Sequence, residues 1–230
     1  MPAKPENTAK IHKAIVMPAV NLREMGWLKK ETDLLQSHKW FIYCMGRTRR
    51  DECHYPRSRK GREAAAYLSY IVDFYDVLPK YTVFIHSIRH QWHNDFLGDT
   101  TIPILKRLRH ESADRVGFAN LKCSHFPGCP LLLEPLTPSP KDLKKNNIRA
   151  RFPDVYQHFF NTTRAEVPEA IGAACCAEFV VSRDRIRKRS RAEYERMLEW
   201  LERNEVDSAR DAGWVFEVTW HIIFGKEPVQ

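Results

Sequence analysis

The sequence has no long hydrophobic run. None of its 230 residues lies in a segment with the roughly 18 consecutive apolar residues that a membrane-spanning helix needs. Residues 1–20 also lack the apolar core of a secretory signal, because their short apolar run is interrupted by Pro18. These absences predict a cytoplasmic protein, and the polar, proline-containing residues 1–11 predict a disordered leader.

Several catalytic signatures are missing as well. The chain has neither a glycine-rich phosphate-binding loop nor a nucleophile-elbow motif, which weighs against kinases, P-loop enzymes and ordinary hydrolases. No spacing of Cys or His matches a familiar zinc site, although His86, His90 and His93 lie close together in the sequence. We therefore expect no metal and no other cofactor.

Cysteine is present, but without the pattern of a disulfide framework. The six cysteines are Cys44, Cys53, Cys123, Cys129, Cys175 and Cys176. Because thiols stay reduced in the cytoplasm, these residues are predicted to be free thiols or small buried side chains. The adjacent Cys175 and Cys176 are expected to alternate in a packed strand.

Positive charge is in excess. The 37 Lys and Arg residues against 29 Asp and Glu give a formal net charge of +8. Such an excess favours an anionic partner such as nucleic acid, with a merely solvated surface as the alternative interpretation. The basic residues gather in four segments, 47–50, 57–62, 141–151 and 183–191.

The hydrophobic pattern predicts strands that alternate with helices. The predicted strands, rich in β-branched and aromatic residues, are 13–20, 38–45, 81–86, 117–123 and 177–182. The predicted helices, with apolar residues spaced by three and four, are 61–78, 102–110 and 190–203. Segment 213–225 fits either a helix or a strand, and the proline-rich segment 126–153 is expected to be an extended or mobile excursion. This order predicts a single three-layer α/β domain over residues 12–230, with a central, mostly parallel sheet.

Side chains suited to proton transfer follow the strand predicted at 81–86. His86, His93 and Asn94 lie at or just beyond its end. Ligands bind at the carboxyl ends of strands in open α/β sheets, and imidazole is well suited to proton transfer near neutral pH. We interpret these three residues as candidates for a pocket.

A second candidate group lies near the C-terminus. If 213–225 is helical, Glu217 and His221 lie one turn apart and can form a hydrogen-bonded acid–base pair, flanked by Trp214 and Trp220. A carboxylate among apolar neighbours needs a partner or a raised pKa. Glu217 is therefore the strongest single catalytic candidate, and a structural carboxylate is the alternative.

Five segments, in the same order, resemble a fungal family long known only as a domain of unknown function. They are KGREAAAYLSYIVDFYDVLPKYTVFIH (60–86), WHND (92–95), GFANLKC (117–123), CCAEFVVSRDRIRKRSRAEYERMLEWL (175–201) and VFEVTWHIIFGK (215–226). The resemblance covers residues 13–226. Glu178 departs from the family pattern, which usually has glutamine at that position.

The resemblance implies a function. Some members of that family are arginine-containing cyclodipeptide synthases, which join arginine and a second amino acid from charged tRNAs into a diketopiperazine. The fold of the family is similar to that of GT-A nucleotide-sugar transferases, so a GT-A-like glycosyltransferase is the second hypothesis. The chain lacks the Asp-x-Asp motif by which such enzymes hold a metal, and its basic segments suit tRNA better. A non-catalytic RNA-binding module is the third hypothesis.

Under the first hypothesis each candidate residue has a role. Glu217 and His221 handle protons, and His86, His93 and Asn94 polarise or orient the ester. The candidates for substrate binding, carboxylates for the arginine guanidinium and one aromatic residue, are Glu63, Asp73, Glu178 and Trp220. The candidates for contact with tRNA phosphates are Arg57, Arg59, Lys60, Arg62, Arg183, Arg185, Arg187, Lys188 and Arg189. The sequence does not single out one covalent nucleophile. The alternatives for such a nucleophile are Ser182, Ser87 and the cysteines.

Overall fold

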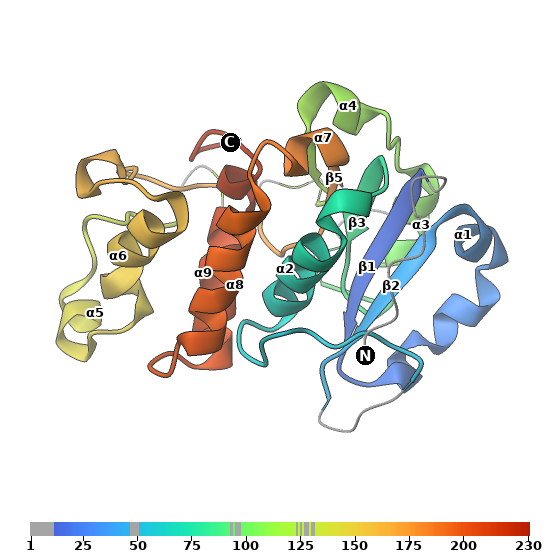
Figure 1. The fold of residues 1–230 in the computed structure, drawn as a ribbon, viewed down its shortest axis with the longest axis horizontal. Coiled ribbons are helices and arrows are strands. Elements are labelled where there is room, and N and C mark those ends of the chain that lie inside the picture. The colour runs from blue at the N-terminus through green and yellow to red at the C-terminus, as the bar shows by residue number, and fades with distance from the viewer. Residues whose placement is uncertain are drawn as a thin grey trace.

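The computed structural model describes residues 12–46, 51–92, 94, 98–122, 124, 126, 129 and 132–230. Its centre is a five-stranded sheet in the order β2-β1-β3-β5-β4 (Figure 1). The strands are β1 (Lys13–Ala19), β2 (Lys39–Cys44), β3 (Tyr81–Phe84), β4 (Phe118–Asn120) and β5 (Phe179–Ser182). All five lie within segments predicted as strands. The predicted leader, residues 1–11, lies outside the described residues.

The sheet is mixed. Strand β1 pairs in parallel with β2 and β3, whereas β5 pairs antiparallel with both β3 and β4. Among the described strands β5 therefore runs against the other four, and the predicted α/β domain with a central sheet is confirmed. The register sets Phe84 opposite Phe179. The residues that follow β3 thus lie beside those that precede β5.

Helices cover both faces of the sheet, which makes three layers (Figure 1). The helices whose buried side chains pack on one face are α2 (Glu63–Phe74), α6 (Ile148–Phe160), α8 (Arg191–Arg203) and α9 (Ala209–Ile223). Those that pack on the other face are η2 (Leu22–Lys30), α1 (Thr32–Ser37), α3 (Thr101–Arg107) and α4 (Ser112–Val116). The short elements that remain are η3 (Tyr75–Val77), α5 (Pro140–Lys145), η4 (Arg164–Glu166) and α7 (Arg183–Ile186). Successive residues of β1 supply the two cores, because side chains of a strand alternate between faces.

The predicted long helices form where their patterns are strongest. Helix α2 and the single turn η3 fill the segment predicted as helix and end before Pro79, which cannot continue a helix. Helix α8 begins at a capping box, in which Ser190 and Glu193 satisfy each other's backbone N–H groups. Segment 213–225, left open by the sequence, is helical in α9.

The expectation of an extended segment is wrong over residues 140–153. Helix α5 starts at Pro140, a residue whose fixed φ suits the first helical position. The side chain of Asn147 then caps α6 by accepting from the backbone N–H groups of Arg149 and Ala150. Helix α6 packs on the core through Phe152 and Phe159, which are fully buried. Tertiary burial thus outweighs the turn-like composition of the segment.

The cysteine prediction is also corrected. Disulfide bonds join Cys44 to Cys53 and Cys175 to Cys176, so these four residues are not free thiols. Cys175 and Cys176 lie in the loop before β5 and not in a strand, since φ is +91° at Cys176 and +49° at Ala177. Backbone in that left-handed region cannot continue a β ladder. Among the helices of the described residues, none is long and apolar enough to cross a membrane.

Candidate functional site

The structure brings His86, just beyond β3, together with charged groups from three other parts of the chain. The backbone N–H of His86 donates to Glu178 Oε1 at 2.9 Å, and the imidazole Nε2 lies 2.9 Å from the carbonyl oxygen of Cys176. Burial lowers the pKa of His86, but the negative charges of Glu178, Glu63 and Glu217, with the hydrogen bond to Cys176, outweigh burial and raise it. We call His86 and these three carboxylates the acidic cluster.

The hydrogen bonds define how His86 is held. A carbonyl oxygen only accepts, so Nε2 of His86 carries a hydrogen and donates it to Cys176. The raised pKa favours the imidazolium form, whose positive charge offsets part of the negative charge around it. Glu178 itself is buried, with a relative exposure of 3%. A buried carboxylate needs such donors and a nearby cation to remain ionised.

Tyr67 is a member of this neighbourhood that sequence reasoning missed. It follows Glu63 by four residues on α2, so both side chains share one helix face. Its hydroxyl is buried without a hydrogen-bond partner among the described residues. Burial, and then the charges of Glu63 and Glu178, raise the pKa of the Tyr67 phenol well above its ordinary value. The phenol therefore stays protonated and can donate to a bound group. The helical spacing from Glu63 is the signal in the sequence that could have identified it.

A cavity of about 280 Å³ adjoins the acidic cluster and shares Glu217 with it. Its aromatic walls are Phe118, Phe179 and Trp220, all buried. The Tyr67 and Trp220 ring centroids lie 5.9 Å apart, which links the cavity wall to the neighbourhood of His86. The other lining residues are Val116, Ala119, Asn120, Lys122, Ser124, Ala173, Ala174, Ala177, His221, Lys226 and Gln230.

The predicted Glu217–His221 pair lies in this cavity wall, but the two side chains have different surroundings. Both residues are on α9, one turn apart. His221 Nε2 donates to the carbonyl oxygen of Pro228 at 3.0 Å, and burial lowers its pKa although that hydrogen bond opposes the shift. His221 is therefore neutral at neutral pH. The charge of Glu217 acts on His86 instead.

Asn94 and Asp73 have polar partners outside the acidic cluster. Asn94 is buried, and its side-chain amide donates to Thr101 Oγ1 at 2.9 Å, a contact that ties its loop to the start of α3. Asp73 accepts from Arg57 Nε at 2.9 Å near the far end of α2. Ten residues of helix separate it from Glu63, about 15 Å. His93 lies outside the described residues.

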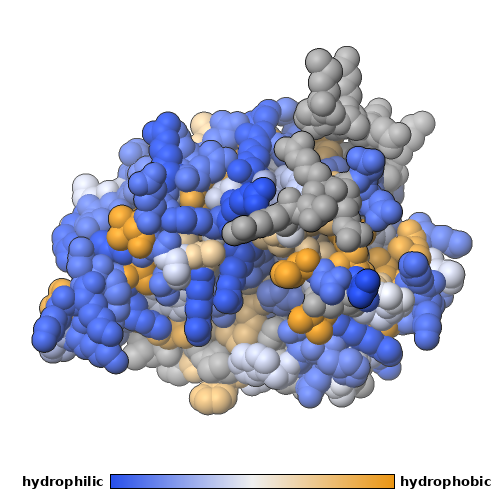
Figure 2. Space-filling model, turned by 90° about the horizontal axis from the view of Figure 1, so that it is seen from below, coloured by the Kyte–Doolittle hydropathy of each residue, from blue (hydrophilic) through white to orange (hydrophobic). Residues whose placement is uncertain are grey.

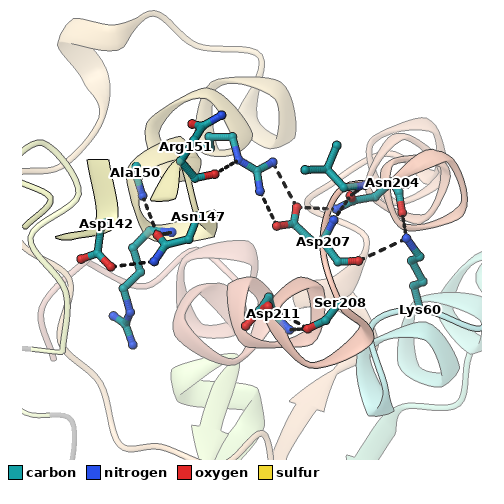
Figure 3. Close-up of polar contacts among 12 residues, drawn as sticks. Lys60, Asp142, Asn147, Ala150, Arg151, Asn204, Asp207, Ser208 and Asp211 are labelled. Carbon is teal, nitrogen blue, oxygen red and sulfur yellow. Dashed lines mark hydrogen bonds and ion pairs between the residues drawn. The ribbon is translucent and has the colours of Figure 1, made fainter. Parts of the chain in front are cut away.

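The basic segment 57–62 precedes α2 and lies at the same end of the sheet as His86. Seen from the end of the molecule where this segment lies, hydrophilic residues cover most of the surface (Figure 2). Arg59 and Arg62 are exposed, whereas the ammonium of Lys60 donates to the carbonyl oxygens of Asn204 and Asp207 (Figure 3). Lys60 thus holds the loop between α8 and α9, and the two arginines are available to a partner.

The network around Lys60 extends to α6. The guanidinium of Arg151 forms a bidentate ion pair with the carboxylate of Asp207, and Asn204 Nδ2 donates to the same carboxylate at 2.9 Å (Figure 3). The side chain of Asp207 is only 4% exposed. These contacts join α6, the α8–α9 loop and segment 57–62 into one rigid support for the start of α2.

The basic segment 183–191 lies at the other end of the sheet. Arg183 follows β5, and its backbone N–H donates to Lys80 next to the start of β3. Because five residues of extended chain separate it from Glu178, the two lie about 17 Å apart. The expected basic rim is therefore not beside His86.

The side chains of three arginines of this segment contact the protein's own backbone. Arg187 donates to the carbonyl oxygens of Tyr75 and Asp76, and Arg189 donates to that of Ile223. These are carbonyl groups left over at helix ends. The guanidinium of Arg185 packs so closely over Gly117 and Gly225 that a Cβ at either position would require Arg185 to move. Arg183, Lys188 and Arg191 are the other basic residues of the segment. Arg183 pairs with Asp184, Arg191 pairs with Asp76 and Glu195, and Lys188 is exposed.

No group of three or more His, Cys, Asp or Glu residues in the described part of the chain is arranged to hold a metal ion. The acidic cluster is a set of charges around an imidazole. Such a set can bind a cationic group and accept or donate protons.

Comparison with known proteins gives one family. No curated protein and no solved structure matches the chain. The model of a family described as "Protein of unknown function (DUF3431)" matches residues 15–230, nearly the whole sequence, and the chain therefore belongs to the DUF3431 family.

Proposed function

We propose that this protein is a tRNA-dependent cyclodipeptide synthase that joins arginine to a second amino acid. The observation that carries the proposal is the acidic cluster inside a chain with a formal net charge of +8. An exterior rich in basic residues attracts a polyanion, whereas an acidic pocket selects a cationic substrate group. The resemblance of the quoted segments to arginine-containing cyclodipeptide synthases supports the same assignment.

The charges of the acidic cluster match those of the substrates. Three carboxylates and one imidazolium sum to a charge of −2 when all are ionised. The guanidinium of an arginyl group and the ammonium that becomes the nucleophile carry +2 together. Glu63 and Glu178 suit the guanidinium, which pairs with carboxylates in a bidentate manner. Glu217 lines the cavity and suits the ammonium.

The reaction uses the energy of the aminoacyl ester. The ammonium of one aminoacyl-tRNA first loses a proton, for which Glu217 is the acceptor. The amine then attacks the ester carbonyl of the other aminoacyl-tRNA, a C–N bond forms, the C–O bond to the tRNA breaks, and the remaining amine proton passes to the tRNA hydroxyl. A second attack by the free amine of the dipeptidyl ester closes the six-membered ring and releases the second tRNA. His86 donates to the developing oxyanion or orients the ester, and binding of both substrates supplies proximity.

The partner and the location follow from this chemistry. The enzyme needs arginyl-tRNA and a second charged tRNA, which the cytoplasm supplies, and no further cofactor. Arg59 and Arg62 are exposed at the end of the sheet where His86 lies, and they are the first candidates for phosphate contact.

Expression in a bacterial host tests the proposal. We expect arginine-containing cyclic dipeptides in the medium, detected by mass spectrometry. Glu217→Gln keeps the shape of the side chain but removes the proton acceptor, so the product should fall by about 100-fold or more. Glu202→Gln, at an exposed position of α8, is the matched control and should leave the product unchanged. Bound tRNA without product in the wild type would point to an RNA-binding module, and thermal protection by a sugar nucleotide with manganese would point to a glycosyltransferase.

A further inference from the structure

We propose that the cavity beside Glu217 binds the side chain of the second amino acid, and that this side chain is aromatic or large and aliphatic. The inference rests on the proposed function and goes beyond it, because it assigns a substrate class to a particular cavity.

Aromatic residues and alanines make up the apolar part of the cavity wall. Phe118, Phe179 and Trp220 line it, and the Phe179 and Trp220 ring centroids lie 5.4 Å apart in a packed aromatic group. Alanines at 119, 173, 174 and 177 also line it, and the polar part of the wall includes Asn120, Lys122, Lys226 and Gln230. A space of this kind is filled best by an apolar group, whose burial removes apolar surface from water.

The size of the cavity fits one side chain. Its volume of about 280 Å³ lies below the roughly 300–1,000 Å³ of pockets that hold drug-sized ligands. A nucleotide with its sugar and phosphates is too large for it, whereas the side chain of phenylalanine, tryptophan or leucine fits.

The position of Glu217 connects the cavity with the chemistry. Its carboxylate lies in the cavity wall and also acts on His86 in the acidic cluster. An amino acid whose ammonium contacts Glu217 can therefore direct its side chain into the cavity, while the arginine guanidinium occupies the cluster. His221 adds little charge to the wall, because burial lowers its pKa.

The test narrows the cavity and measures which products remain. Ala174 lines the cavity, is half-buried, and does not have the positive φ found at Ala177, so a larger residue is tolerated by the backbone there. In Ala174→Leu we expect the ratio of products with a bulky second residue to products with glycine or alanine to fall about 10- to 100-fold. Ala192→Leu, at an exposed position of α8, is the matched control and should keep the wild-type ratio. Val116→Ala, which widens the cavity, should shift the ratio toward bulky residues.

A binding measurement separates this inference from the proposed function. Phenylalaninamide carries the ammonium and the aromatic side chain but no tRNA, and its affinity for the purified wild type and for folded Ala174→Leu is measured by calorimetry. Weaker binding to Ala174→Leu supports the cavity assignment even if the wild type makes no cyclic dipeptide, an outcome that overturns only the proposed function. An unchanged product ratio in folded Ala174→Leu, or equal binding of phenylalaninamide and glycinamide to the wild type, overturns the cavity assignment.

Discussion

At the scale of single residues, the surroundings of a histidine decide its charge. His38 and His110 lie on the face of the sheet opposite α2, outside the candidate site, with their Nε2 atoms 3.1 Å apart. Burial and the positive charge of Lys13 lower the pKa of both residues, and that of His110 falls to about 4. His86 shows the reverse, since its carboxylate neighbours outweigh burial. At the same pH, His86 is therefore more readily protonated than His38 and His110.

The His38–His110 pair predicts acid sensitivity of the fold. Folded His110 stays neutral until the pH nears 4, whereas the unfolded chain binds its proton below the ordinary value of 6.5. The stabilisation is fully present above pH 6.5 and is lost as the pH falls from 6.5 to about 4, by at most roughly 3 kcal/mol. Urea unfolding at several pH values measures this loss.

A variant isolates the contribution of the pair. His110→Leu should flatten the dependence of the unfolding free energy on pH over that range, because the titrating group is gone. His90→Gln, at an exposed position, should keep it. An equal slope in His110→Leu and in the wild type would show that other groups cause the acid sensitivity.

At the scale of elements, the site depends on how closely α2 and α9 approach. A Cβ at Gly213 of α9 would lie 2.9 Å from the carbonyl oxygen of Gly61, just before α2. The contact needs a residue without a Cβ at position 213 of α9. It brings the helices that carry Glu63 and Glu217 together. The spacing of the acidic cluster thus depends on a close approach between α9 and the backbone just before α2.

Gly213→Ala should therefore lower the stability. The added methyl group meets backbone atoms that cannot rotate away, so we expect a loss of about 1–3 kcal/mol in the free energy of unfolding. Gly26→Ala is the matched control, because a Cβ there meets nothing within 4 Å. Denaturant unfolding compares the two variants, and equal stability of both would contradict the role assigned to the contact.

The elements also show which parts of the fold can be predicted from local sequence patterns. The strands and helix α8 have strong periodicity or clear caps, and they lie close to their predicted limits. Helix α6 is not predictable from local composition, because Pro153 and the polar residues before it are typical of loops. Its aromatic residues are buried only because the core of α8 and α9 lies opposite, and this packing joins segments that are distant in the sequence.

At the scale of the whole molecule, the two ends of the sheet differ in the contacts that their basic residues make. The exposed Arg59 and Arg62 lie at the end with His86, and segment 183–191 lies at the other end with three arginines already bound to the protein's own backbone or packed on it. If tRNA delivers its ester to the acidic cluster, the end of the sheet with Arg59 and Arg62 must contact the tRNA phosphates.

This difference predicts unequal effects of charge reversal. The double change Arg59→Glu and Arg62→Glu should weaken tRNA binding by about tenfold or more. It should also reduce the salt dependence of binding by roughly one counterion for each phosphate that the arginines no longer neutralise. Arg183→Glu with Lys188→Glu has the same change of charge and should have a smaller effect. Filter binding at several salt concentrations measures both, and a stronger effect of the second pair would contradict this orientation.

The sequence by itself determined the α/β class and the strand positions, and it singled out His86, Glu63, Glu178 and Glu217 as candidates, because apolar periodicity and residue chemistry are local properties. The tertiary structure decided which of the candidates meet. It placed Asp73 and segment 183–191 away from the acidic cluster, gave Asn94 a partner in Thr101, added Tyr67, and paired cysteines expected to be free. The physical reason is that strand direction and helix contacts join residues far apart in the chain, and the sequence pattern of any one segment does not specify its partner.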